Sequence, residues 1–595
     1  KKGKNMSSIK KIEPTAKEKN RKTAITRFVD GHVKVIVIVA LTVAILAVGC
    51  AVGLIMHGRN VAIDGVKYEY SEILGGYVAS AKSTDITGAL VLSEVDGKPV
   101  LALADEAFKG CYALKKIELP SSLIRVGKSA FDGCTSLKYT EVEGSLYLGN
   151  SKSPYLLLVS YQDDEKRNAI ALPEGVKIIA PHAFTKSEHL ITISFPETLK
   201  VISDEAFIGA PSLGSVTLYE GLEYVGASAF KNCLYMEYVH LPESVKEVGE
   251  AAFENCMLLG AVDFPTGLTE IKAYTFAGCF SLEVISLPTN LTTIGESAFA
   301  GCWQAFSGKF EIPSTVTTIG KTAFSRCDAI TELTIPDSVT SMGEQTFAGC
   351  AALNLVRIGG GLFEIPVSAF SACTKLKAIY MSEGVTAIGA SAFDGCTALM
   401  ACDIPDSLTK LGAGAFFDCS ALDSYTSYGG ASYLGNAQNP YVALVKVTNG
   451  DTGFTMHPDT KCFAADAFAE WMGLESITIA EGVTVIPDGA FFGCLSLTRV
   501  NLSSKTTEIG ADAFALCRML DSIDLPDTLA KIGNSAFYGT AALKSIVIPA
   551  SVKYMGKNVF NDSGITEVLC EADAQPTAWD AEWIHDKSLV TFGAK

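Results

Sequence analysis

Gly295-Glu296-Ser297-Ala298-Phe299-Ala300-Gly301-Cys302 is the stretch that decides the fold, because variants of it recur along most of the 595 residues. The Ala-Phe pair, or a variant such as Thr346-Phe347, occurs in 18 copies. The spacing from one repeat Phe to the next is 23 residues almost everywhere, with single exceptions of 25, 53 and 52 residues. A fixed period of this length indicates a solenoid, in which each repeat is one rung stacked on the next.

Each repeat carries the signals for two short extended pieces and a turn. Ile285 and Leu287 recur with a period of two, which is typical of a short strand with one buried face. Pro288 ends this strand, because Pro cannot donate to a strand ladder. A second extended piece, Leu291 to Ile294, ends at Gly295, where we expect a corner with positive φ. A short helical turn that carries the repeat Phe and Cys follows.

The predicted fold class is therefore a repeat solenoid, with a β-strand plus a short helical turn in each rung of about 23 residues. Some twenty rungs at about 4.8 Å each would make a rod about 95 Å long. Thirteen of the 17 cysteines follow the repeat Phe by three residues. We interpret them as a stacked column of small buried thiols, since free Cys behaves as a small hydrophobe in cores. Some disulfides between rungs remain an alternative, because the rung spacing allows them.

The N-terminal region has a separate character. Residues 1–34 contain eleven Lys or Arg and three acidic residues, and we expect a disordered, basic cytoplasmic tail. Val35 to Met56 is a run of 22 uncharged residues, long enough for a transmembrane signal-anchor helix. The positive-inside rule then places the N-terminus in the cytoplasm and the repeats outside the cell. The alternative is a lipoprotein attached at Cys50, because the residues before it resemble a lipoprotein cleavage box.

Departures from the 23-residue period divide the rest of the chain into regions. Two long spacings share a Tyr-Leu-Gly-Asn…Pro-Tyr motif, and we predict a β-hairpin insert at each. Solenoids need caps over their first and last rungs, and the sequence outside the period supplies candidates for both. The predicted domains are an N-terminal β cap at 57–104, repeats at 105–569 with inserts near 140–175 and 425–460, and a C-terminal cap at 570–595.

Composition and motifs argue against catalysis and against nucleic acid. The net charge is −17, and the excess of acid lies outside the basic tail, whereas phosphate binding needs clustered Lys and Arg. The seven His are scattered, and the sequence lacks the HExxH zinc motif and the GxSxG nucleophile elbow. We therefore predict no catalytic, cofactor-binding or metal-binding residue, and we expect the chain not to be an enzyme.

The strand face that points away from the core is the better candidate for function, because solenoids bind partners through extended surfaces. Tyr and Arg are favoured anchors in interfaces. The alternative is that these side chains are ordinary solvated strand residues. The candidate binding face consists of Tyr238, His240, Arg357, Tyr380, Arg499 and Asn501.

The repeat pattern L-x-x-I-x-I-P-x-x-V-x-x-I-G-x-x-A-F-x-x-C resembles the BspA-like leucine-rich repeat of bacterial surface proteins, which is also expanded in some parasitic protists. The resemblance covers about residues 60–595 and includes the inserts and the Trp-containing C-terminal end. It implies an extended right-handed solenoid on a cell surface, with roles in adhesion and no shared catalytic residues. The departures are the rungs of Phe184, Phe207, Phe468, Phe537 and Phe560, which lack the following Cys.

The leading functional hypothesis is a membrane-anchored, non-catalytic surface protein that binds extracellular proteins or cell-surface macromolecules, with the membrane reached through Val35 to Met56. We expect a monomer. One alternative is a structural spacer or cell-wall component without a specific ligand. A more distant alternative is a surface hydrolase that uses the hairpin inserts.

Overall fold

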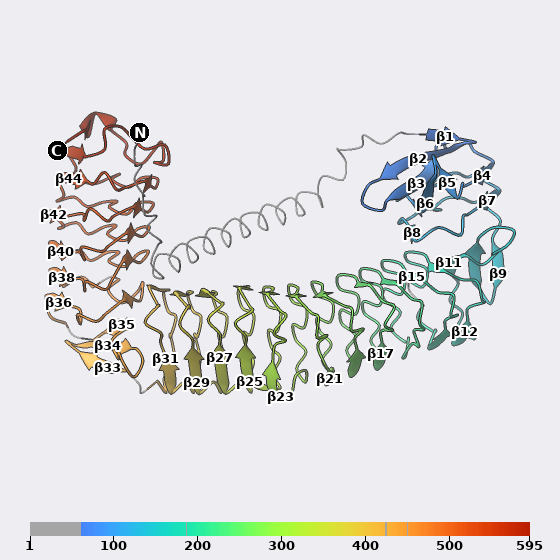
Figure 1. The fold of residues 1–595 in the computed structure, drawn as a ribbon, viewed down its shortest axis with the longest axis horizontal. Helices are drawn as coiled ribbons and strands as arrows, with labels where there is room; N and C mark the ends of the chain where they lie inside the picture. Colours follow the sequence, from blue (N-terminus) through green and yellow to red (C-terminus); the bar gives the residue numbers. More distant parts are fainter. Residues whose placement is uncertain (1–60, 186, 423–424, 449, 470, 595) are drawn as a thin grey trace, which may run out of the picture.

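The computed structural model describes residues 61–594 except 186, 423–424, 449 and 470. Figure 1 shows these residues as an arch, in which a first arm, a central segment and a second arm meet at two corners. The prediction that the rungs form a single rod is therefore wrong. The first arm comprises residues 61–139, the central segment residues 162–422 and the second arm residues 450–594, and the two inserts, at residues 140–161 and 425–448, lie at the corners.

Each regular rung contributes an outer strand and an inner strand, and each pairs in parallel with its counterpart on the next rung. The outer strands follow the outer edge of the arch in Figure 1, and the inner strands follow the inner edge. In β27 (Leu355–Ile358), Val356 and Ile358 are buried and Arg357 is exposed, as the period of two predicts.

The outer strands are β4 (Gly88–Leu90), β7 (Lys116–Glu118), β12 (Ala169–Ala171), β14 (Thr192–Ser194), β17 (Tyr238–His240), β19 (Ala261–Asp263), β21 (Val284–Ile285), β23 (Gly308–Glu311), β25 (Ile330–Ile335), β27, β29 (Ala378–Met381), β31 (Ala401–Asp403), β36 (Gly453–Thr455), β38 (Ser476–Thr478), β40 (Arg499–Asn501), β42 (Ser522–Ile523), β44 (Ser545–Ile548), β46 (Glu567–Cys570) and β47 (Val590–Phe592). The inner strands are β8 (Arg125–Val126), β13 (Ile178–Ile179), β15 (Val201–Ile202), β16 (Tyr224–Val225), β18 (Glu247–Val248), β20 (Glu270–Ile271), β22 (Thr293–Ile294), β24 (Thr318–Ile319), β26 (Ser341–Met342), β28 (Glu364–Ile365), β30 (Ala387–Ile388), β32 (Lys410–Leu411), β37 (Cys462–Phe463), β39 (Val485–Ile486), β41 (Glu508–Ile509), β43 (Lys531–Ile532) and β45 (Tyr554–Met555).

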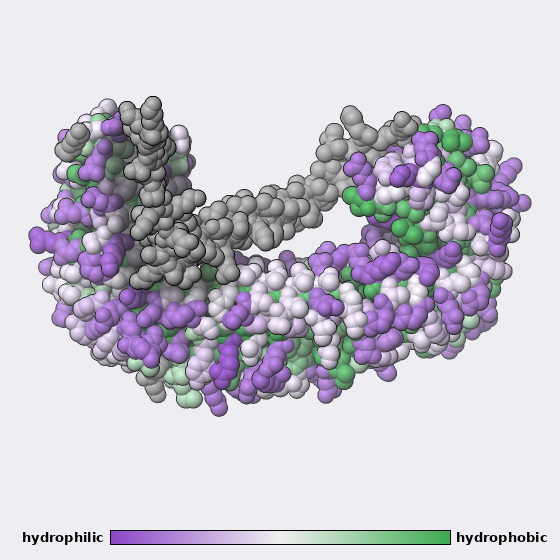
Figure 2. Space-filling view, viewed as in Figure 1, coloured by the Kyte–Doolittle hydropathy of each residue, from purple (hydrophilic) through white to green (hydrophobic). Residues whose placement is uncertain are grey.

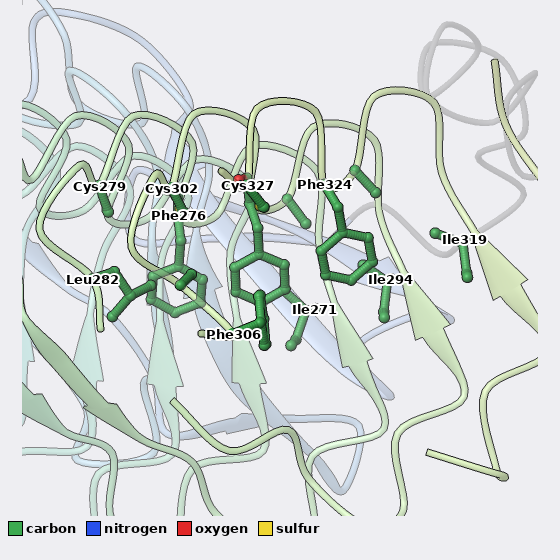
Figure 3. Packing of buried hydrophobic residues seen from close by; sticks show 14 of the residues in the cluster. Ile271, Phe276, Cys279, Leu282, Ile294, Cys302, Phe306, Ile319, Phe324 and Cys327 are labelled. Atoms are coloured by element: carbon green, nitrogen blue, oxygen red, sulfur yellow. Dashed lines mark hydrogen bonds between the residues drawn. The ribbon is translucent and has the colours of Figure 1, made fainter. Parts of the chain in front are cut away.

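The repeat phenylalanines form a continuous column of buried rings within each part of the arch. The rings of Phe276 and Phe299 lie 5.6 Å apart between centroids and are inclined by 6°, and both side chains are fully buried. Figure 3 shows Phe276 and Phe324 among the buried side chains of this part of the core. Backbone bonds run beside the rings, since the N–H of Phe276 donates to the carbonyl of Ala298 in the next rung at 2.9 Å. Ring burial and main-chain pairing therefore stabilise the same contact between rungs.

The cysteines form a second column next to the rings. The Cys302 thiol donates to the carbonyl of Phe276, one rung back, at 3.1 Å, and the same contact recurs along the chain (Figure 3). All sixteen cysteines in the described part of the chain are free and buried, so the thiol column is present without disulfides there. Burial raises the pKa of the Cys256 and Cys302 thiols to about 12.

The turn that precedes each Phe differs from the expected one in two ways. Gly295 does not lie in the left-handed region, and a Cβ there would lie 2.5 Å from the backbone N of Ala273 in the preceding rung. Glycine is therefore needed here because the preceding rung leaves no room for a Cβ atom. The prediction of positive φ at this residue was wrong. Positive φ occurs two residues later instead, at Ser297 (51°). The expected helical turn is a run of i→i+3 bonds, as from Cys302 N–H to the Phe299 carbonyl at 3.1 Å.

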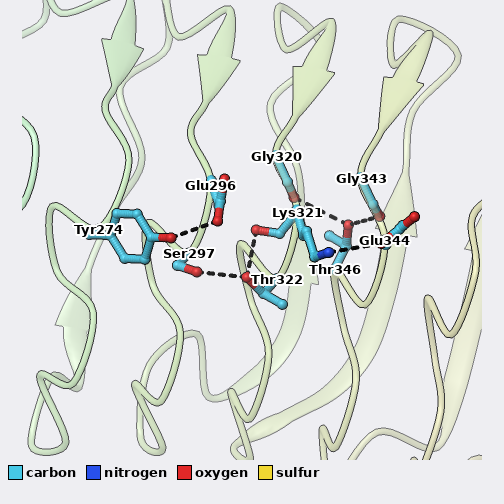
Figure 4. A network of polar contacts seen from close by, with 9 residues as sticks. All are labelled: Tyr274, Glu296, Ser297, Gly320, Lys321, Thr322, Gly343, Glu344 and Thr346. Atoms are coloured by element: carbon cyan, nitrogen blue, oxygen red, sulfur yellow. Dashed lines mark hydrogen bonds and ion pairs between the residues drawn. The ribbon is translucent and has the colours of Figure 1, made fainter.

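Polar side chains link successive rungs beside these turns (Figure 4). The Tyr274 hydroxyl donates to Glu296 at 2.6 Å, and the Lys321 ammonium pairs with Glu344 at 2.9 Å. Thr346, which replaces the usual Ala before the repeat Phe, is buried and donates to the Gly343 carbonyl at 2.5 Å. The exposed pairs add little stability each, whereas the buried hydroxyl of Thr346 needs its acceptor.

Each insert is a three-stranded antiparallel unit. In the first, the two-residue turn Glu143-Gly144 has positive φ at both positions (50° and 77°) and joins two strands, and a longer loop with Gly149-Asn150 leads to the third. The third strand of each insert then pairs in parallel with an inner strand of the next segment. The strands are β9 (Thr140–Val142), β10 (Ser145–Leu148) and β11 (Leu157–Tyr161) in the first insert, and β33 (Thr426–Tyr428), β34 (Ala431–Leu434) and β35 (Ala443–Val447) in the second.

Both ends of the arch are covered. The first arm begins with a sheet of β1 (Val61–Ile63), β2 (Val66–Ser71), β3 (Gly76–Ala81), β5 (Glu94–Val95) and β6 (Lys98–Leu103). At the other end, beside the 3₁₀ helix η1 (Lys587–Leu589), Trp583 is buried and lies 5.9 Å from Phe560 in a T-shaped contact. Trp583 thus closes the last ring column.

The predicted cytoplasmic tail (1–34), the transmembrane helix (35–56) and Cys50 lie outside the described residues. Among the residues that the structure does describe, no helix has the length and apolarity needed to cross a bilayer.

The ring column yields a first prediction. Phe276→Ala removes a buried ring with a stacked neighbour on each side, so we expect the rungs around it to lose about 3–5 kcal/mol of opening free energy. Native-state hydrogen exchange is the suitable measurement, because long repeat arrays do not unfold in one step. Phe363→Ala is the control, since Phe363 is 63% exposed, and should change the opening free energy by no more than about 0.5 kcal/mol. Equal effects of the two substitutions would contradict the role of the column.

The thiol column yields a second prediction. Burial raises the pKa of Cys256 and Cys302 to about 12 in the folded chain, above an ordinary value of about 8.5, so the folded state holds these protons more tightly. Their contribution to stability is complete below about pH 8.5 and is lost as the pH rises toward about 12. We expect the melting temperature to fall over this range, and to fall less steeply in a Cys256→Ala/Cys302→Ala variant. Identical pH slopes for the two proteins would be the contrary result.

Candidate binding surfaces

Tyr238 and His240, both predicted from the sequence, lie on β17 and face the same acidic residue of the next strand, β19. The Tyr238 hydroxyl donates to Oδ2 of Asp263 at 2.5 Å, and Nδ1 of His240 lies 3.5 Å from the same oxygen. This hydrogen bond to Asp263 raises the pKa of the Tyr238 hydroxyl. The three side chains form a polar group on the outer edge of the central segment.

Arg357 and Tyr380 are directly opposite each other on β27 and β29. The guanidinium carbon of Arg357 lies 5.0 Å from the centre of the Tyr380 ring, which is a cation–π geometry. Asp403 is the next residue in register after Tyr380. This pair presents an aromatic and cationic surface next to a carboxylate.

Arg499 and Asn501 lie on β40 in the second arm, beyond the second insert. The Asn501 side-chain amide donates to the Thr478 hydroxyl on the neighbouring strand at 3.1 Å. The six predicted residues therefore fall into three separate groups, and the structure does not bring them together into one site. What they share is only the outer strand face.

A surface that was not predicted runs along the rim just after the Cys column, on successive rungs of the central segment. We call it the rim stripe, and it consists of Tyr235, Met257, Leu258, Phe280 and Trp303. Tyr235 is 61% exposed and Trp303 is 42% exposed. Figure 2 shows that polar side chains cover much of the face in view. Large apolar side chains are also exposed outside the stripe, as at Tyr112 and Phe417, but those of the rim stripe follow one another on adjacent rungs.

The far end of the rim stripe is ordered by stacking. The rings of Phe280 and Trp303 lie 4.4 Å apart with an inclination of 15°, and the Arg326 guanidinium lies 5.9 Å from the Trp303 ring. The signal in the sequence lies one or two positions after the repeat Cys. Met257, Phe280 and Trp303 occupy the first of these positions, which holds Ala351 or Thr397 farther along the central segment, and Tyr235 and Leu258 occupy the second. Aromatic and Arg side chains in such a cluster are typical anchors of protein interfaces.

The described residues do not gather potential metal ligands at one place. They contain no group of three or more His, Cys, Asp and Glu side chains that could hold a metal ion. The closest His–carboxylate pair is His189 with Asp163, at 2.8 Å, and the bond raises the pKa of His189. The same Asp163 oxygen also accepts the backbone N–H groups of Glu188 and His189, so its role is to fix a turn.

The inserts do not face a common site. Figure 1 places them at opposite corners, and the regular rungs from Phe184 to Phe416 separate them. The second insert gathers Tyr428, Tyr441 and His457, and the rings of Tyr441 and His457 stack at 3.5 Å. This aromatic packing holds the insert to its neighbouring rung.

Comparisons with known proteins give the family and the fold. The sequence matches the family described as "BspA type Leucine rich repeat region" in six copies, over residues 98–153, 160–258, 200–307, 304–423 and 456–575. No curated protein matches the chain in sequence.

Several similar solved structures are leucine-rich repeat proteins of bacteria. One from Bacteroides ovatus is 21% identical, with 86% of this chain and 94% of that chain covered and a TM-score of 0.30. A leucine-rich cell surface protein from Faecalibacterium prausnitzii is 22% identical, with 61% and 93% covered and a TM-score of 0.27. The leucine-rich repeat protein of T. pallidum is 24% identical, with 42% and 91% covered and a TM-score of 0.22. Since the family match spans well over half of its length, the chain belongs to the BspA-type leucine-rich repeat family.

Proposed function

We propose that this chain is a non-catalytic cell-surface protein that binds an extracellular protein partner through the rim stripe of its central segment. The observation that supports the proposal is a row of exposed aromatic and apolar side chains on adjacent rungs, ending in the stacked Phe280, Trp303 and Arg326. Interfaces concentrate their binding energy in such aromatic and Arg anchors. The acidic charge of the repeats disfavours nucleic acid as the partner.

The proposal includes an anchor. Val35 to Met56 is apolar and uncharged over 22 residues and follows a basic tail, which supports a single-pass protein with its repeats outside the cell. The polar groups of β17, β27 and β29 then add secondary contacts on the outer edge of the arch. The protein acts as a monomer in this proposal.

The anchor is tested in cells by a substitution and a protease. Cys50→Ala should leave the protein in the membrane fraction after alkaline washing, because a transmembrane helix needs no lipid on this residue. Protease added to intact cells should remove the repeats and leave a fragment that contains residues 1–34. Release of the Cys50→Ala protein into the soluble fraction would show that the lipoprotein alternative is correct.

The binding surface is tested with the purified chain on a surface plasmon resonance chip against a panel of extracellular-matrix proteins. For a partner that binds saturably, Phe280→Ser/Trp303→Ser should weaken the affinity at least about tenfold, because the two stacked rings, with Arg326 beside them, are the aromatic anchor of the rim stripe. The control is Phe363→Ser, which removes a ring that is 63% exposed and lies outside the stripe, and it should change the affinity less than about twofold.

Two results would count against this proposal. If Phe280→Ser/Trp303→Ser and Phe363→Ser weaken the affinity equally, the binding site lies elsewhere on the arch. The absence of any saturable partner in the panel would favour the alternative of a structural spacer without a specific ligand.

A further inference from the structure

Each corner of the arch contains a cleft where an insert meets the last regular rung before it. The first elbow cleft has a volume of about 470 Å³ and lies between the turn of Phe131 and strand β11. The second elbow cleft has a volume of about 780 Å³ and lies between the turn of Phe416, strand β35 and Trp471. Both occur where the spacing of the repeat Phe is 53 or 52 residues in place of 23.

The turns that form these clefts have main-chain donors without acceptors among the residues that the structure describes. In an uninterrupted rung, alternate N–H groups of the turn donate to the next rung, as Ser391, Phe393 and Gly395 donate to Ala413, Ala415 and Phe417. The equivalent N–H groups of Ser129, Phe131 and Gly133 donate to nothing in the described residues. In the described part of the second corner, the same is true of Phe416 and Asp418, and of Phe468 just beyond it.

The ring columns also end at these clefts. Phe131 and Phe416 each stack on one neighbour only, Phe108 and Phe393, because the ring that would follow belongs to the displaced rung. Their side chains are 7% and 6% exposed, whereas Phe393 within the column is fully buried. Each cleft is therefore lined by a repeat ring that is still largely buried and by a row of N–H donors that have no acceptor in the described residues.

In the second cleft, one N–H of this row already donates to a side-chain oxygen. Gly414 is the first donor of the row. Its N–H donates to Oδ2 of Asp466, a residue of the next rung, at 3.1 Å. The donors of Phe416 and Asp418 continue the same row toward Tyr425 and Trp471, where no acceptor of the described chain reaches them. An occupant must therefore bring acceptors at alternate positions and an apolar side chain between them.

We propose that the elbow clefts bind a peptide segment of a partner protein, in which a small residue precedes an aromatic one. Its main-chain carbonyls would accept from the free N–H row, and its ring would continue the interrupted Phe column. An added segment of main chain satisfies such donors in the way that strand addition satisfies a free sheet edge. The repeat itself provides the example of such a peptide. In uninterrupted rungs, the Ala-Phe turn of the next rung accepts hydrogen bonds from the equivalent N–H groups and stacks its ring on the Phe column.

The test uses the full chain and a synthetic peptide, Gly-Glu-Ser-Ala-Phe-Ala-Gly-Ser, which copies residues 295–302 with Ser in place of Cys302. Trp471 lines the second cleft and reports binding through its fluorescence, and Trp471→Phe identifies its part of the signal. We expect a saturable change in Trp471 emission. A peptide with Ala in place of Phe should bind at least about tenfold more weakly, because it buries no ring.

A matched pair of variants locates the site. Ala469 lines the second cleft, and Ala469→Phe should weaken peptide binding at least about tenfold by filling it. Ala300→Phe makes the same change at the same position of an uninterrupted rung and should change binding less than about twofold. Circular dichroism melts of both variants show whether each one folds.

The inference fails if Trp471 emission does not respond to the peptide, or if folded Ala469→Phe and Ala300→Phe weaken binding equally. These outcomes leave the proposed function untouched, because the rim stripe is a different surface and its partner is assayed separately. Phe280→Ser/Trp303→Ser should bind the peptide as the unaltered chain does.

Discussion

The structure depends on one contact, the stacking of each Phe turn on the next. A rung of 23 residues has too little apolar surface to fold alone, and stacking buries the ring, the thiol and the aliphatic side chains together. The main chain takes part at the same place, since the turn of one rung donates its alternate N–H groups to the turn of the next. The close approach at Gly295 shows how tightly this contact confines the backbone, because a single Cβ there would overlap the preceding rung.

Most of the rung was predictable from the sequence. The Phe and Cys columns, the alternation in the outer strand and the family follow from the repeat, because each is a local property that recurs at a fixed spacing. The arch was not predictable, since the direction of stacking at an insert depends on how β11 and β35 join the next segment. The role of Gly295 was also misjudged, because a close approach between two rungs and a positive φ both favour glycine in a sequence.

The candidate site was predicted less well than the fold. Tyr238 with His240, and Arg357 with Tyr380, were correctly placed on an exposed outer strand face, but a column of strands is long and its residues need not be neighbours. The rim stripe was missed because its residues lie one or two positions after the repeat Cys, where the period does not reveal exposure. The regular positions of the repeat build the fold, and the departures from it, in the rim stripe and the two corners, form the surfaces that distinguish this chain from a plain solenoid.

The central claim is that the stack is continuous within each part of the arch and interrupted at its two corners. Hydrogen exchange of the full chain without any ligand, read at the repeat phenylalanines, tests this claim most directly. We predict slow exchange of the Phe amides inside the columns, such as Phe276 and Phe393, and fast exchange of those of Phe131 and Phe416, whose N–H groups have no acceptor in the described residues. Slow exchange at all four positions would contradict the account, because it would mean that the stack runs through the corners unbroken.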